Sequence, residues 1–501
     1  MILRPQIDDV KVVGYYLGNL IVGIAIVSII PLIACLVSSE WDPALDFTIG
    51  ISISFLFGYL MLIACRTKKE INWTHGMIVV SLSWVVASVF GAIPLYLSDH
   101  FMSFLDAVFE AMSGYATTGL TLAVDLDHMS YGHNLWRHLI MFIGGQGIVV
   151  VALTFLIKAG GGAFKMYVGE ARDERIMPNI IHTARFIWLV SIVYLVLGTL
   201  GLGIASTLAG MPFGKSLFHG ACITMAAFDT GGFAPQSQNV LYYHSGLYES
   251  INIILMFFGA INFKLHYALW VGNKREIYKN VETRLFAITI VFTFFLTAVG
   301  LAKTGIYSNA VVLFRKGFYH LISGHTGTGH GTLYARQFAT QWNELSLIGI
   351  VIAMALGGAV CSTTGAIKML RVALIFKAFK QDVKQFLSAE SAVIIQKLHH
   401  VKDIIIEDKQ TRAAALIMLA YILCYFFGAI IGVLYGYPFL LSLFESTSAC
   451  ANVGLSCGIT TPSMPWVLKV VYIFQMWAGR LEFISVFVFM GFLISAVRGK
   501  S

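Results

Sequence analysis

The chain has 501 residues, of which 57% are hydrophobic and only 12% are charged. Soluble domains carry about 25% charged residues, so this composition excludes an ordinary water-soluble protein and predicts a multi-pass membrane protein. The net charge of +8 gathers in a few segments between apolar runs, which indicates membrane topology and not a nucleic-acid partner. The seven Cys residues form no C-x-x-C pair, so neither a zinc site nor a disulfide framework is indicated.

Ten apolar runs are long enough to cross a bilayer, which takes about 20 residues of helix. Each run is predicted to form one transmembrane helix, and an even number of spans places both termini on the same side. The runs lie near 13–37, 46–65, 75–97, 135–157, 184–209, 248–271, 283–305, 343–370, 412–436 and 466–496.

Most of the 34 Lys and Arg residues fall on one side of this ten-span arrangement. The loops on the other side are acidic or sparse in charge, and the first of them carries Glu40, Asp42 and Asp46. Cytoplasmic loops carry the excess of Lys and Arg, so the N- and C-termini are predicted to be cytoplasmic. The basic segments are Arg4 with Lys11, Arg66–Lys69, Lys158–Arg185, Lys274–Arg284, Lys368–Arg412 and Arg498–Lys500.

After the first two runs, one pattern recurs four times: an apolar run, a short segment too polar to cross, and a second apolar run. Each short segment starts with about 10 apolar-periodic residues, a helix of about 15 Å, and ends in small residues around a glycine. One such segment alone is typical of a connecting loop, but four in the same place in four hairpins indicate a duplicated re-entrant loop. The segments are FLDAVFEAMSGYATTGL, SLFHGACITMAAFDTGGF, FRKGFYHLISGHTGTGH and SLFESTSACANVGLS, with glycines Gly119, Gly232, Gly329 and Gly454.

The bilayer restricts what a re-entrant loop can be. Irregular backbone at membrane depth survives only where it lines water or is buried in protein. A short helix that ends near the membrane centre presents its negative dipole end to a cation, and glycine-rich backbone can turn its carbonyl oxygens toward an axis. Four such loops predict a selectivity filter for a small cation. The predicted fold is an all-α integral membrane protein, with four tandem helix–pore-loop–helix repeats around one pore plus two extra N-terminal transmembrane helices.

The predicted division of the chain follows these repeats. It comprises an N-terminal two-helix extension (1–70), repeat 1 (71–165), repeat 2 (166–280), repeat 3 (281–375), a cytoplasmic linker (376–411) and repeat 4 (412–501). The basic segment Lys368–Arg412 is interpreted either as a docking surface for a partner or as a solvated amphipathic helix. On such a helix His399 and His400 point to different faces, which speaks against a metal site.

The run GGAVCSTTGAIKMLR at 357–371 interrupts an apolar stretch with residues that disfavour a straight helix. Broken backbone below a filter is a candidate gate, and the alternative is a face of small residues for helix packing. Arg480 also lies inside an apolar run, where a charge is expected to face the protein interior or a water-filled cavity. It is either a gating residue or a cap for carbonyls of the interrupted segment. The predicted gating residues are Gly357, Gly358, Cys361, Gly365, Lys368 and Arg480.

Each of the four repeats carries a more specific sequence pattern. FEAMSGYATTGL with LWRHLIMFIGGQGIVVVALTFL lies in repeat 1, and GAINFKLHY, GGAVCSTTGAIKMLRV and AGRLEF lie in repeats 2, 3 and 4. Together they resemble the Trk/Ktr family of bacterial potassium uptake proteins, and the two extra N-terminal spans resemble its Trk branch. The resemblance implies a pore-forming subunit of the bacterial cytoplasmic membrane, a homodimer with one pore per protomer, and a cytosolic ring of nucleotide-binding regulatory subunits.

The resemblance also assigns a filter, with K+ as the bound ion, and places Arg480 beneath it. Two residues depart from the family pattern. His330 stands where an aromatic residue is usual, and Asp229 stands where a small neutral residue is usual. We expect His330 at the outer mouth, where its protonation would repel cations. The implied filter residues are Thr117, Thr118, Gly119, Thr230, Gly231, Gly232, Thr326, Gly327, Thr328, Gly329, Asn452, Val453 and Gly454.

Two other functions compete with a potassium channel-like subunit. A proton- or sodium-coupled secondary transporter usually needs inverted repeats and membrane-embedded carboxylates, whereas the repeats here share one orientation. A membrane enzyme needs a nucleophile or a metal, and no H-E-x-x-H motif, G-x-S-x-G motif or paired intramembrane carboxylates occur in the sequence. The leading interpretation is therefore a potassium channel-like uptake subunit, and a proton- or sodium-coupled transporter on the same scaffold is the alternative. We expect no enzyme activity and no organic cofactor.

Overall fold

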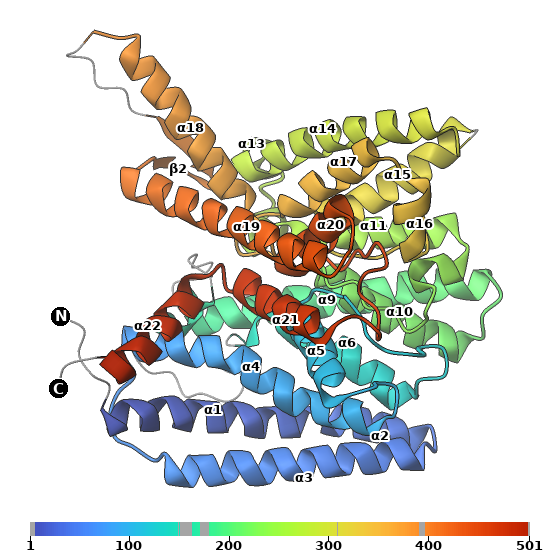
Figure 1. The fold of residues 1–501 in the computed structure, drawn as a ribbon, viewed down its shortest axis with the longest axis vertical. Helices are drawn as coiled ribbons and strands as arrows, with labels where there is room; N and C mark the ends of the chain where they lie inside the picture. The colour runs from blue at the N-terminus through green and yellow to red at the C-terminus, as the bar shows by residue number, and fades with distance from the viewer. Residues whose placement is uncertain are drawn as a thin grey trace.

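The computed structural model describes residues 6–148, 150, 163–170, 180–307, 309–389 and 396–498. Its long helices form one bundle, and the two termini lie at the same end of that bundle (Figure 1). An N-terminal extension precedes the repeats. Its first helix is interrupted only at Ser28, so α1 and α2 make one apolar span of 31 residues. The extension comprises α1 (Ile7–Val27), α2 (Ile29–Val37) and α3 (Trp41–Ala64).

Four units of one kind follow, each with a long first helix, a short pore helix, a filter segment and a second helix. This arrangement confirms the fold class predicted from the sequence. Repeat 1 contains α4 (Trp73–Leu97), α5 (Phe104–Tyr115) and α6 (Tyr131–Gln146), and repeat 2 contains α9 (Ile180–Leu208), α10 (Phe213–Phe228) and α11 (Gly246–Ala260). Repeat 3 contains α14 (Val281–Thr304), α15 (Ala310–His325) and α17 (Glu344–Ala355), and repeat 4 contains α19 (Asp408–Leu434), α20 (Phe439–Cys450) and α21 (Trp466–Arg480).

Shorter elements connect these units. They are α8 (Ala163–Gly169), the 3₁₀ helix η1 (Asn239–Tyr243), α12 (Phe263–Trp270), α13 (Glu276–Lys279), α16 (Ala335–Gln341), α18 (Met369–Phe386), β1 (Lys397–His400), β2 (Lys402–Ile405) and α22 (Ile484–Arg498). The domain boundaries drawn from the sequence stay predictions. Parts of the predicted basic segments, namely Arg4, residues 158–162 and 171–179, and residues 499–500, lie outside the described residues.

Polar residues fix where many of the helices begin. A side-chain oxygen just before the helix accepts a hydrogen bond from a backbone N–H of the first turn, which would otherwise have no partner. The same device recurs in first helices, pore helices and second helices. The capping residues are Asn72, Ser103, Ser130, Ser245, Asn280, Asn309 and Asn343.

Large apolar side chains cover the outside of the bundle. On α3, Leu56 is 61% exposed, and on α19, Leu416 and Leu423 are 61% and 60% exposed. A soluble monomer rarely shows contiguous apolar surface of this kind. Within the described residues, six segments are single helices long and apolar enough to cross a membrane. The chain is therefore a multi-pass membrane protein.

The prediction of ten continuous spans is wrong for the second helices of the repeats. The predicted spans 248–271 and 466–496 are bent pairs, in which α11 meets α12 at 103° and α21 meets α22 at 113°. In the second pair the bend contains Glu482 and Phe483, both with positive φ. Hydropathy reports an apolar environment and not the direction of the helix axis, so the bends leave no mark in an apolar run.

The other two second helices are interrupted as well. The predicted span 135–157 breaks after α6 at Gly147, whose φ is 95°, and most of its second half lies outside the described residues. In repeat 3, α17 ends at Ala355 and α18 begins at Met369, so the interruption predicted at 357–371 is confirmed. All four second helices therefore stop partway through their repeats.

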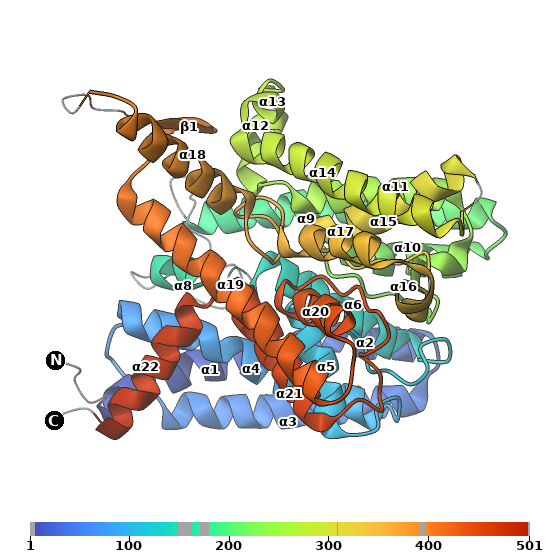
Figure 2. The same ribbon diagram turned by 45° about the horizontal axis from the view of Figure 1, so that its top comes forward.

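The basic segment Lys368–Arg412 contains a helix and a hairpin. α18 extends away from the bundle with the hairpin beside it (Figures 1 and 2). β1 and β2 pair antiparallel, so the expectation that His399 and His400 lie on a helix is wrong. His399 lies 2.7 Å from Asp403 and 3.1 Å from Glu276. The imidazole of His399 holds the pKa of the Asp403 carboxyl below its ordinary value through their hydrogen bond. Residues 390–395 of this segment lie outside the described residues.

Candidate ion-conduction site

The four predicted filter segments meet in the structure. At each filter glycine, a Cβ atom would overlap a backbone carbonyl oxygen of the next repeat, so only glycine permits the approach. The series returns to its starting point, and the four segments therefore form a closed ring. The pairs are Gly119 with the carbonyl of Gly231, Gly232 with that of Thr328, Gly329 with that of Val453, and Gly454 with that of Thr118.

Each segment of this ring has the same backbone conformation. The filter glycine and the residue two positions before it both have left-handed φ angles, and the residue between them does not. Alternation of this kind turns successive carbonyl groups toward the same side of a segment, an arrangement that can replace the hydration shell of an ion. The angles are 51° and 86° at Thr117 and Gly119, 52° and 73° at Thr230 and Gly232, 71° and 82° at Gly327 and Gly329, and 54° and 95° at Asn452 and Gly454.

The residue before each glycine is held by its own pore helix. Its backbone N–H donates to a carbonyl five residues earlier, so its donor is used inside the repeat while its carbonyl faces the glycine of the preceding repeat in the ring. Pore helices also end here, and their negative dipole ends favour a cation. The four bonds run from Thr118 to Ser113 (2.8 Å), Gly231 to Ala226 (2.8 Å), Thr328 to Ser323 (2.8 Å) and Val453 to Ser448 (2.9 Å).

Thr326 is the one predicted filter residue that lies on the pore-helix side of this pattern. It follows α15 directly with a right-handed backbone. Its hydroxyl lies 2.8 Å from the carbonyl oxygen of Ile322 and 2.8 Å from the hydroxyl of Thr328. The side chain therefore contacts the filter segment of repeat 3 from the end of its pore helix.

Cavities of unequal size lie on the two sides of the ring. Beyond the glycines is a cavity of about 200 Å³, lined by Gly119, Gly329, Gly454, Asn239 and Tyr334 among others. On the side of the interrupted segment the cavity is about 30 Å³, which is room for about two water molecules. An ion leaving the ring on that side meets protein in this conformation.

The two residues that depart from the family pattern lie behind the ring. His330 is buried, with its Nε2 3.1 Å from the carbonyl oxygen of Phe233 and its Nδ1 3.2 Å from Asn252. The expectation that it faces the outer mouth is wrong, because the side chain turns back toward repeat 2. Asp229 is also buried, and it accepts a hydrogen bond from Gln146 (2.7 Å) at the end of α6.

The loop between α17 and α18, residues 356–368, lies against the ring. The hydroxyl of Thr363 is 3.1 Å from that of Thr230 in the filter segment of repeat 2. A Cβ at Gly358 would crowd the carbonyl of Ala260, and one at Gly365 would overlap the carbonyl of Ala451. These predicted gating glycines therefore let the loop approach repeats 2 and 4. Gly357 does the same inside the loop, because a Cβ there would overlap the carbonyl of Gly365.

Arg480, at the end of α21, ties this loop to the rest of the site. Its Nη1 donates to the carbonyl of Thr363 (2.6 Å), and its Nη2 donates to the carbonyls of Gly144 (2.7 Å) and Gly145 (3.3 Å). The fixed fork of a guanidinium suits several acceptors at once. One side chain of repeat 4 thus connects the loop of repeat 3 to the last turn of α6 in repeat 1.

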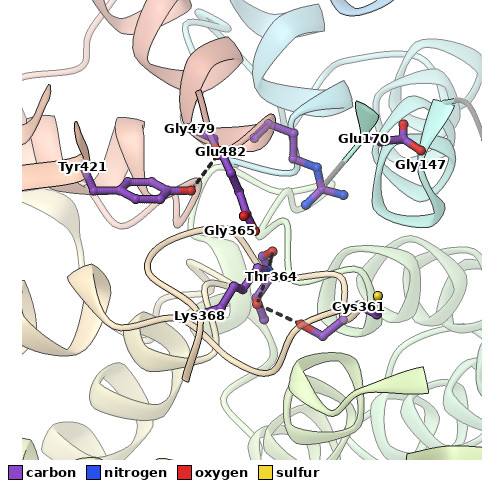
Figure 3. A pocket seen from close by; sticks show the side chains of 11 residues that line it. Gly147, Glu170, Cys361, Thr364, Gly365, Lys368, Tyr421, Gly479 and Glu482 are labelled. Atoms are coloured by element: carbon purple, nitrogen blue, oxygen red, sulfur yellow. Dashed lines mark hydrogen bonds between the residues drawn. The ribbon is translucent and has the colours of Figure 1, made fainter. Parts of the chain in front are cut away.

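The remaining predicted gating residues line the small cavity beside Arg480. Figure 3 shows Cys361, Thr364, Gly365 and Lys368 with Gly479 around this space. The ammonium group of Lys368 donates to the carbonyl and the hydroxyl of Thr364, so it closes a turn of the loop on itself. Cys361 has a φ of 53°, and its carbonyl accepts a hydrogen bond from the backbone of α12.

Sequence reasoning missed Glu282, which fixes the same loop from below. This buried carboxylate at the start of α14 accepts a hydrogen bond from the backbone N–H of Val360 (2.7 Å). Its other oxygen lies 3.4 Å from Nδ1 of His400 in the hairpin. In the sequence, an acid after the cap Asn280 is typical of an exposed first helical turn. No local signal shows that it reaches the loop.

Comparisons with known proteins agree with this architecture. The family model described as TrkH, a cation transport protein, matches residues 44–495. An uncharacterized cation transporter of Methanocaldococcus jannaschii is 31% identical over 97% of this chain and 96% of its own length. The Trk system potassium uptake protein TrkG of Escherichia coli is 27% identical, over 97% of this chain and 99% of its own length.

A solved structure has the same fold. The crystal structure of the potassium transporter TrkH from Vibrio parahaemolyticus superposes with a TM-score of 0.80 at 23% sequence identity, covering 95% of this chain and 98% of that one. Because the family model spans most of the sequence, including all four filter segments and the interrupted loop, the chain belongs to the TrkH family of cation transport proteins.

Proposed function

We propose that this chain is the pore-forming subunit of a potassium uptake system and conducts K+ through the ring of four filter segments. The observation that carries the proposal is the closed ring, in which every corner has a left-handed glycine that faces a carbonyl of the next repeat. Carbonyl oxygens arranged in this way substitute for the hydration shell of a weakly hydrated cation. Relatives in Escherichia coli and Vibrio parahaemolyticus are named for potassium uptake and transport, which supports the choice of ion.

The proposal includes a gate on the side of the small cavity. Arg480 and the loop 356–368 obstruct the path below the ring, and opening requires the loop to leave the carbonyl contacts of Arg480. The contact from Glu282 to Val360 and His400 joins the loop to the hairpin. We place the hairpin, α18 and both termini in the cytoplasm, where a ring of nucleotide-binding regulatory subunits would act on them. The working form is a homodimer with one pore in each protomer.

A coupled secondary transporter is the second candidate, and one observation favours it. Asp229 is a buried carboxylate directly before the filter segment of repeat 2, and intramembrane carboxylates serve as proton relays. In a coupled transporter, a proton gradient alone would drive K+ or Rb+ uptake. In a channel, the gradient of the permeant ion alone sets the direction of flux.

Flux measurements on purified protein separate these candidates. The protein is reconstituted in liposomes loaded with KCl, and uptake of radioactive Rb+ is followed without a proton gradient. The proposal predicts Rb+ uptake that stops when the K+ gradient is collapsed and is indifferent to an imposed pH gradient. Uptake that requires the pH gradient, and disappears in Asp229→Asn, would instead establish the coupled transporter.

A further inference from the structure

The backbone that leaves each filter glycine is held by a side chain of the pore helix. In repeat 1 this side chain is Glu110, nine residues before Gly119 and fully buried. Its Oε2 accepts a hydrogen bond from the backbone N–H of Leu122 (3.0 Å), three residues after the glycine, and its Oε1 accepts one from the Thr121 hydroxyl (3.0 Å). The Nη2 atom of Arg137 lies 2.7 Å from Oε1 of Glu110 and balances its charge.

Repeat 4 has the same arrangement in the same register. Glu445 stands nine residues before Gly454 and is fully buried. It accepts hydrogen bonds from the backbone N–H of Cys457 (2.9 Å), from the Ser456 hydroxyl (2.7 Å) and from the backbone N–H of Thr460 (2.7 Å). The donors at two and three residues after the glycine are therefore the same groups as in repeat 1.

Repeat 3 makes the backbone bond with a different side chain. His320 stands nine residues before Gly329, and its Nε2 accepts from the backbone N–H of Thr332 (3.0 Å). Its Nδ1 lies 2.7 Å from the carbonyl of Lys316 and must carry the ring hydrogen, since a carbonyl only accepts. The position two residues after the glycine is Gly331, which offers no hydroxyl, and the imidazole provides one acceptor for one donor.

Repeat 2 lacks the acceptor and also lacks the donor. The residue nine before Gly232 is Ile223, which is fully buried, and the residue three after it is Pro235, which has no N–H. The residue two after the glycine is Ala234, whose carbonyl instead accepts from Arg137 (3.2 Å). In all four repeats, the hydrogen-bond acceptors of the residue nine positions before the glycine thus match the donors of the residues two and three positions after it. Such a match is expected for polar groups that are buried together.

We propose that Glu110, His320 and Glu445 are positioning residues of the filter, which set its ion preference by fixing the backbone just beyond each glycine. This inference rests on the proposed function of the ring. The carbonyl before each glycine is held on one side by its own pore helix. The bond to the pore-helix side chain holds the segment on the other side, only a few residues from the ring. Without it the ring carbonyl gains freedom, and a ring that adapts its diameter discriminates less between K+ and Na+.

Repeat 3 offers the sharpest test, because one acceptor meets one donor there. His320→Ile copies the residue of repeat 2 but leaves the Thr332 N–H buried without a partner, and we expect the K+-over-Na+ preference to fall about fivefold or more. Adding Thr332→Pro removes that donor and completes the pairing found in repeat 2, so the double variant should regain most of the preference. His320→Gln keeps an acceptor at a reach like that of Glu and should stay near wild type.

The measurement is competition of K+ and Na+ against Rb+ uptake in liposomes, with thermal unfolding as a check on folding. His219→Ile is the matched control, because His219 is a buried pore-helix histidine that bonds to Tyr243 and not to a filter segment. Equal preference in wild type and His320→Ile would overturn the proposal, as would a loss in His320→Ile that Thr332→Pro does not reduce.

The proposal can be tested even if one variant does not fold. If His320→Ile does not fold, the proposal still requires His320→Gln and the double variant to fold and to keep their K+-over-Na+ preference. Failure of either variant overturns the proposal. A wild-type protein that takes up no Rb+, or takes it up without preference for K+ over Na+, would contradict the proposed function itself. A selective wild type whose variants keep the same K+-over-Na+ preference would contradict only the positioning role.

Discussion

The carbonyl oxygen of Thr118 faces Gly454 so closely that a Cβ at Gly454 would overlap it. The two residues belong to the first and last repeats, so this contact closes the ring of filter segments within a single chain. A helix–pore-loop–helix unit cannot bury irregular backbone alone. Four units arranged in a circle give each filter segment a neighbour on both sides, and the closure explains why the chain carries four copies.

Arg480→Ala should raise passive Rb+ flux by about tenfold. The side chain makes charge-assisted hydrogen bonds to the carbonyls of Thr363 and Gly144, and loss of about 1.4 kcal/mol from such bonds shifts a two-state equilibrium by that factor. Flux in liposomes without regulatory subunits is the measurement. Arg412→Ala, at an exposed position near the start of α19, should leave flux unchanged. Unaltered flux in folded Arg480→Ala would leave Arg480 with a packing role only.

Glu282→Leu should loosen the same gate from its other side. The change leaves the backbone N–H of Val360 buried without its acceptor, at a cost of about 1–3 kcal/mol. We expect higher passive flux than in wild type, together with a lower unfolding temperature. Glu282→Gln keeps an oxygen for Val360 and should show a smaller rise. If both variants conduct like wild type, the contact between Glu282 and the loop does not hold the gate closed.

The local part of the site could be predicted from the sequence. The filter depends on backbone conformations that glycine adopts at little cost, so Gly119 and its three counterparts carry their own signal. The interruption after Ala355 is equally local, because the small residues that follow it disfavour helix. These features can be recognised in the sequence because, at each of them, the residue type itself favours one backbone conformation.

The long-range part could not be predicted in this way. The acceptors of Arg480 are backbone carbonyls in repeats 1 and 3, and every residue has a carbonyl, so sequence gives no preference among them. The expectation for His330 is wrong for a related reason, since the residue after a filter glycine can face the cavity or turn back toward Asn252. The bends at 103° and 113° change the direction of the helix axis, which hydropathy does not record.

Lys469→Met should destabilise the fold by about 3–5 kcal/mol, because removal of one partner leaves a buried charge uncompensated. Lys469 on α21 donates to Asp106 on α5 at 2.5 Å, and both side chains are at most 9% exposed. The pair joins repeats 4 and 1 on the outside of the ring closure. Chemical unfolding in detergent measures the change in free energy. Replacing Asp106 by Leu in the same protein should restore part of the loss, and the exposed Lys409→Met should cost almost nothing.

The filter itself is tested most directly by Gly119→Ser. Gly119 has a φ of 86°, and a Cβ there would overlap the carbonyl oxygen of Gly231, so that carbonyl must leave the ring. Gly210→Ser is the control, because Gly210 has a φ of 98° and no atom lies within 4 Å of an added Cβ. The control variant therefore carries the same backbone strain, about 1–2 kcal/mol, without overlap with a carbonyl oxygen. Competition of K+ and Na+ against Rb+ uptake should show a K+-over-Na+ preference lowered about tenfold or more in Gly119→Ser and unchanged in Gly210→Ser. A Gly119→Ser protein that folds and keeps the wild-type preference would contradict the assignment of this ring as the potassium filter.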